Sequence, residues 1–80
     1  MKRADLKTVV AGVLEIEPGD LTAETDLNTI DSFDSVNVLT LMIALDEQAG
    51  IRIGPVDANA LRFYGDIERL AEKQGIVLED

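Results

Sequence analysis

The stretch DSVNVLTLMIALDEQ, residues 34–48, decides the fold of this chain of 80 residues. Asp34 and Ser35 are both residue types preferred at helix starts, and the long apolar run behind them predicts a helix that continues to Gln48. Ser35 directly precedes that run, so we expect its hydroxyl on the surface at the positive end of the helix dipole. A phosphate group is stabilised at such a position, which therefore suits covalent attachment.

On a projection at about 100° per residue, this helix carries two apolar strips. One strip is expected to face the core and consists of Val38, Leu41, Met42, Leu45 and Ala49. The other, the second strip, starts beside Ser35. Its apolar side chains are Val36, Leu39 and Ile43, and its acidic flank farther down the helix is formed by Asp46 and Glu47. It is either more core, if the bundle covers the helix on two sides, or an exposed docking surface with an acidic rim.

The chain before this helix predicts one further helix and a long loop. Residues 5–15 carry apolar side chains at helical spacing, at Leu6, Val9, Val10, Val13 and Leu14. The turn at residues 18–20 ends that helix. Residues 21–33 are rich in Thr, Asp and Asn, and we expect a loop anchored by Leu21, Leu27 and Ile30.

The chain after it predicts two more helices and no sheet. Gly50 is a plausible helix stop, and we expect Ile51 and Ile53 of an extended connector to fill the core. A short helix is predicted over residues 56–61. A fourth is predicted over residues 64–73, with three residues facing inward: Ile67, Leu70 and Ala71. The tail from residue 74 is expected to fray at its end, with docking of Ile76, Val77 or Leu78 on the core as the alternative.

Size and composition argue against an enzyme. A chain this short forms one domain, residues 1–80, and buries only about 60 to 65% of its unfolded surface, which leaves no room for a deep pocket beside a core. It contains no histidine and no cysteine, so the usual general base, the thiolate nucleophile and the common zinc ligand sets are absent. A hydrolase is therefore the weakest of the functional hypotheses.

The net charge of -9, from 16 acids against 7 bases, argues against nucleic acid as a partner. It either serves solubility alone or favours basic protein surfaces as partners. No apolar run approaches the roughly 20 residues of a membrane span, and the first residues lack the apolar core of a signal peptide. We expect a cytoplasmic monomer.

Three fragments, in order and in an acidic chain of this length, resemble the acyl carrier protein family, which includes peptidyl and D-alanyl carrier proteins. They are Phe33-Asp34-Ser35-Val36, Leu41-Met42-Ile43-Ala44-Leu45-Asp46-Glu47 and Tyr64-Gly65-Asp66-Ile67. The resemblance covers nearly the whole chain. It implies an all-α, small four-helix bundle of the acyl-carrier type, with a long loop between helices one and two and a short third helix.

The resemblance also implies a function. A phosphopantetheinyl transferase would move 4′-phosphopantetheine from coenzyme A onto Ser35, and the arm would carry acyl or aminoacyl groups as thioesters. Asp34 matches the family's acid that helps hold magnesium in the transferase complex, while the carrier itself has no resident metal. Acyl-loading and acyl-processing enzymes with basic docking surfaces, from fatty acid, polyketide or specialised acyl biosynthesis, would bind the second strip: Val36, Leu39, Ile43, Asp46 and Glu47.

The chain departs from the family pattern in two ways. Ser32, followed by the bulky Phe33, stands where the family often has glycine, so the loop entering the helix should be less free to bend. Asn37 and Thr40 stand where typical carriers of fatty acid synthesis have acids, which favours a dedicated carrier for a specialised acyl chain. The alternative is an unmodified acidic helical adaptor that binds a basic partner through the same helix. Ser35 would then be only a cap, worth about 1 kcal/mol.

Overall fold

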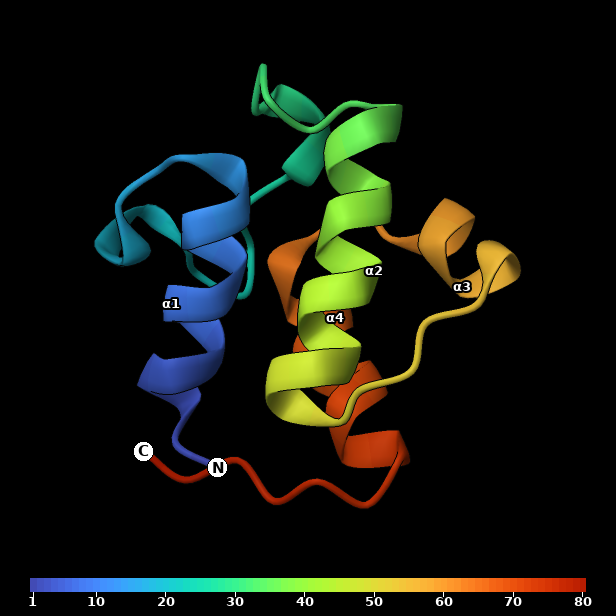
Figure 1. Cartoon of the computed structure of the whole chain (residues 1–80). Helices are drawn as coiled ribbons and strands as arrows, with labels where there is room; N and C mark the ends of the chain where they lie inside the picture. The colour runs from blue at the N-terminus through green and yellow to red at the C-terminus, as the bar shows by residue number, and fades with distance from the viewer.

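A computed structural model describes residues 1–80 and contains four α-helices without a sheet. The helices are α1 (Arg3–Leu14), α2 (Ser35–Ala49), α3 (Pro55–Ala60) and α4 (Tyr64–Lys73). Figure 1 shows α1 and α2 running in opposite directions side by side, with α4 behind α2 and the short α3 to one side. The predicted all-α bundle, with a long first loop and a short third helix, is confirmed.

The helix limits differ from the prediction by one or two residues. α1 ends at Leu14 because Glu15 adopts a left-handed conformation, with φ of 56°, and the Ile16 N–H donates to the Ala11 carbonyl. α3 begins at Pro55 rather than residue 56, since the fixed φ of proline suits the first position of a helix. The start of α2, the left-handed stop at Gly50 and the limits of α4 agree with the prediction.

The core contains nearly all the residues predicted for it. Fully buried side chains come from α1, α2, α4, the long loop and the connector after α2, and include Leu6, Val10, Leu14, Leu21, Leu27, Leu41, Leu45, Ile51 and Ile67. Val9, Val13, Ile30, Met42, Ala49 and Leu70 are half-buried and pack against this core. Ala44 was not in the predicted core strip but is buried, because it lies next to Val9 and Val13 of α1.

Backbone hydrogen bonds hold the long loop against the start of α4. The Leu27 N–H donates to the Arg62 carbonyl at 2.7 Å, and the Tyr64 N–H donates to the Thr25 carbonyl at 2.9 Å. Two short 3₁₀ helices lie between α1 and α2. The first, Pro18–Asp20, falls on the predicted turn, whereas the second, Leu27–Thr29, was not predicted. The loop is therefore an ordered part of the bundle that delivers the chain to the start of α2.

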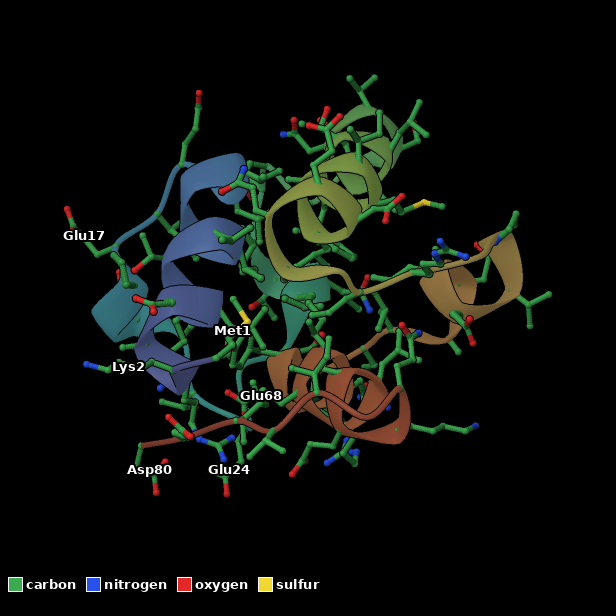
Figure 2. All side chains as sticks on the ribbon, turned by 60° about the horizontal axis from the view of Figure 1, so that its bottom comes forward. Met1, Lys2, Glu17, Glu24, Glu68 and Asp80 are labelled. Carbon is green, nitrogen blue, oxygen red and sulfur yellow. The ribbon has the colours of Figure 1, made fainter.

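The expectation that the tail frays is wrong. The Arg3 N–H donates to the Glu79 carbonyl at 2.7 Å, and the Glu79 N–H donates to the Met1 carbonyl at 2.9 Å. Ile76 and Leu78 pack against the core, which supplies the apolar contact that holds the tail in place. Figure 2 shows Met1, Lys2, Glu68 and Asp80 at this end of the molecule. The start of α2 lies at the opposite end (Figure 1).

Candidate functional site

The first turn of α2 presents a free serine hydroxyl. Asp34 is the N-cap, and its Oδ1 accepts a hydrogen bond from the Asn37 N–H at 2.9 Å. Ser35 is the first helical residue, its side chain is exposed, and it takes part in none of the side-chain hydrogen bonds of the chain. Capping therefore belongs to Asp34 alone, and the Ser35 hydroxyl is free to react.

The electrostatics of this turn favour an anion on Ser35. The first backbone N–H groups of a helix have no carbonyl partner within the helix, and they form the positive end of its dipole. The Asp34 side chain accepts from one of these groups, the Asn37 N–H, while the Asp34 carbonyl accepts the first regular helical hydrogen bond, from the Val38 N–H at 2.8 Å. The N–H groups of Ser35 and Val36 make no backbone hydrogen bond, so they remain available to a phosphodiester on the serine oxygen.

No group of this chain can act as a general base for Ser35 in the manner of a Ser-His pair, because the chain has no histidine. The neighbouring carboxylate of Asp34 already accepts the capping hydrogen bond from the Asn37 N–H. The hydroxyl therefore lacks the hydrogen-bonded base that activates a catalytic serine.

The second strip of α2 lies on the surface. Val36, Leu39 and Ile43 are 71%, 58% and 53% exposed, and Asp46 and Glu47 are exposed beside them. The interpretation of this strip as additional core is therefore wrong. α1 and α4 cover other sides of α2, and the connector after α2 meets only the edge of the strip, at a groove lined by Leu39, Met42, Ile43, Asp46, Arg52 and Ile53.

Comparison with known proteins agrees with this geometry. A family model described as "Phosphopantetheine attachment site" matches residues 4–72. The chain belongs to this family. An acyl carrier protein of Wolinella succinogenes is 31% identical to this carrier domain over 68 residues, which cover 85% of this chain and 90% of the relative.

Membership settles the general character of this carrier domain. It is a non-catalytic protein whose prosthetic group is covalently attached 4′-phosphopantetheine. The start of α2 fits that group, because an exposed hydroxyl without a hydrogen bond lies beside two unpaired backbone N–H groups. None of the four helices has the length and apolarity needed to cross a lipid bilayer.

Two further residues of this carrier domain, whose part in the site was not predicted, form hydrogen bonds next to the start of α2. Ser32 Oγ donates to the Leu14 carbonyl at 2.6 Å, and Asn37 Nδ2 donates to the Ser32 carbonyl at 2.7 Å. The sequence marked both as departures from the family pattern. It carried no signal for the bond between Ser32 and Leu14, because the two residues are 18 positions apart and meet only through the fold.

Proposed function

We propose that this domain carries an acyl or aminoacyl group as a thioester on 4′-phosphopantetheine attached to Ser35. It presents that group to enzymes of fatty acid, polyketide or specialised acyl biosynthesis. The observation that carries the proposal is the Ser35 hydroxyl, exposed and without a hydrogen bond in the first turn of α2. The single core supports one carrier domain, residues 1–80, and we further propose that it works as a cytoplasmic monomer.

The modification is a phosphoryl transfer in which Ser35 is the nucleophile. Its Oγ attacks the coenzyme A phosphorus that bears the pantetheine and forms a new P–O bond. The bond from that phosphorus to the bridging oxygen breaks, and adenosine 3′,5′-bisphosphate leaves with the electron pair. The serine proton passes to a base of the transferase, since this chain offers none. Asp34, exposed next to Ser35, is available to the magnesium of that complex.

The exposed strip of α2 supports docking of basic partner enzymes. Its apolar members lie nearer the serine, while its acids, Asp46 and Glu47, lie at the other end of the helix. At 1.5 Å per residue, Asp46 is about 16 Å along the axis from Ser35. A matching partner offers an apolar patch beside its active site and cations roughly that far away. The neutral Asn37 and Thr40 in between favour enzymes of a specialised pathway.

Intact-mass measurement tests the attachment. We expect coenzyme A and a broad-specificity phosphopantetheinyl transferase to add one arm to the wild-type protein and none to Ser35→Ala. The matched control is Ser32→Ala, which removes the other serine that follows an aspartate and should still accept one arm after prolonged incubation. Failure of the wild type to gain mass, or addition of the arm to Ser35→Ala, would refute the proposal.

The alternative, an unmodified adaptor that binds a basic partner through the same exposed strip, is disfavoured by membership of the phosphopantetheine attachment family. Since Asp34 rather than Ser35 is the cap, Ser35→Ala should change the free energy of unfolding by less than about 0.5 kcal/mol, not by the 1 kcal/mol expected of a cap. Complementation with this variant then separates the two functions without interference from misfolding. A carrier loses activity completely, whereas an adaptor keeps it.

A further inference from the structure

Ser32 joins the loop in front of α2 to the end of α1. Its hydroxyl donates to the carbonyl of Leu14, the last residue of that helix, at 2.6 Å in a partly buried position. This carbonyl has no helical partner, because the residue four positions on is Pro18, which has no N–H group. The bond therefore satisfies an otherwise unpaired group and fixes the position of Ser32 relative to α1.

The carbonyl of Ser32 is bonded as well. It accepts from the Asp34 N–H at 3.0 Å and from Asn37 Nδ2 at 2.7 Å. The backbone N–H of Asn37 donates in turn to Asp34 Oδ1. Ser32 is thus connected to α1 on one side and to the first turn of α2 on the other, and the two connections enclose the segment that contains Ser35.

This network depends on side chains that have no direct role in the chemistry. Ser32 and Asn37 are half-buried, whereas Asp34 and Ser35 are exposed. A glycine at position 32 would have no hydroxyl to donate to the Leu14 carbonyl. An aspartate at position 37 would have no side-chain N–H group to donate to the Ser32 carbonyl. Both bonds therefore exist because of the particular residues at these two positions.

We propose that Ser32 and Asn37 are positioning residues for attachment of the prosthetic group. Together they hold the segment before α2 in one conformation, so that the Ser35 hydroxyl meets the transferase already oriented. Resting on the function proposed above, this inference assigns a role to two of the residues at which the chain departs from its family. A segment ordered before binding loses less conformational entropy on docking, so the effect belongs in KM for the carrier rather than in kcat.

Steady-state kinetics of arm transfer from coenzyme A test the proposal. We expect Ser32→Ala and Asn37→Ala each to raise KM for the carrier about fivefold, with kcat unchanged within about twofold. The double variant should be no worse than about the larger single effect, because both substitutions release the same segment. If the fold increases in KM of the two single variants multiplied in the double variant, the two side chains would act independently, as direct contacts with the transferase do, and the inference would be overturned.

The matched control is Thr8→Ala on α1. It removes a side-chain hydrogen bond of the same kind, from Thr8 Oγ1 to the Ala4 carbonyl at 2.9 Å, which has no connection to the loop before α2 or to the exposed strip of α2. We expect its KM to equal that of the wild type. An equal rise in KM for Thr8→Ala would show that loss of any such surface hydrogen bond impairs arm transfer, and the positioning role would be wrong.

Amide hydrogen exchange provides a readout that needs no transferase. In Ser32→Ala, the N–H groups of Phe33 and Asp34 should exchange about fivefold faster, while those in the middle of α4 keep their wild-type rates. Unchanged exchange at these two amides would refute the inference. If the wild type accepts no arm at all, the proposed function fails. If it accepts one and Ser32→Ala performs equally well, only this inference fails.

Discussion

Tyr64 is the one buried titratable group with a large pKa shift. It lies at the start of α4 and is fully buried. Burial, followed by the negative charge of the nearby Glu68, raises the pKa of its hydroxyl well above the ordinary value of 10. Arg3, the first residue of α1, forms an ion pair with Glu68, so the neighbourhood of Tyr64 links the start of the chain to α4.

This shift predicts the alkaline limit of stability. The folded state keeps the tyrosine proton more tightly than the unfolded chain does, so the contribution of Tyr64 to the free energy of unfolding is complete below about pH 10. That contribution is lost as the pH rises further, towards the pKa of Tyr64 in the folded state. Because Tyr64 is the only tyrosine, tyrosinate absorbance and loss of helical circular dichroism should appear together. Tyrosinate absorbance with an intact helical signal would contradict the prediction.

At the scale of the helices, glycine has opposite effects in α1 and α4. A Cβ on Gly65 would lie 2.8 Å from the Ala23 carbonyl oxygen, which is held in place by the Gly65 N–H. A Cβ on Gly12 of α1 would meet no atom within 4 Å. The first glycine permits close approach of the long loop, whereas the second only weakens its helix.

We therefore expect Gly65→Ala to lower the free energy of unfolding by about 2 kcal/mol or more, through displacement of the loop. Gly12→Ala is the matched control and should raise it by about 0.5 to 1 kcal/mol. Urea denaturation of both variants measures the difference. Equal effects of the same sign would show that the loop does not pack against α4 as described.

Two leucines of α2 separate its exposed strip from its core strip. Leu39 is 58% exposed and Leu41 is 1% exposed, although they are only two positions apart. Leu41→Ala should cost about 2 to 5 kcal/mol, because it leaves a cavity in the core. Leu39→Ala should cost less than about 1 kcal/mol and weaken docking of partner enzymes instead. Thermal melts and transferase kinetics of the two variants separate stability from recognition.

At the scale of the whole molecule, net charge opposes compaction. The chain has 16 acidic and 7 basic side chains, and only a few of the acids form an ion pair. The pairs are Glu68 and Asp80 with Arg3, Asp26 with Arg62, and Asp66 with Arg69. The remaining acids repel one another across a globule whose extents are 29 × 27 × 20 Å. Added ions screen this repulsion over about 10 Å at 0.1 M.

Moderate salt or a divalent cation should therefore raise the melting temperature. The measurement is a series of melts by circular dichroism from low to moderate salt at neutral pH. A charge-neutral osmolyte serves as the control for general solvent effects. A melting temperature that does not respond to salt would show that self-repulsion is a minor term in the stability of this fold.

Local patterns were enough to predict the four helices, the buried leucines of α1 and α2 and the exposed position of Ser35. Helical spacing and capping preferences act within a few residues, so they are visible in the chain itself. The same patterns could not show whether Val36, Leu39 and Ile43 are covered, since that depends on which helices pack around α2. Nor could they show that the tail pairs with the N-terminus or that Ser32 bonds to Leu14, because these contacts join segments far apart in the chain, and only packing of the core brings them together.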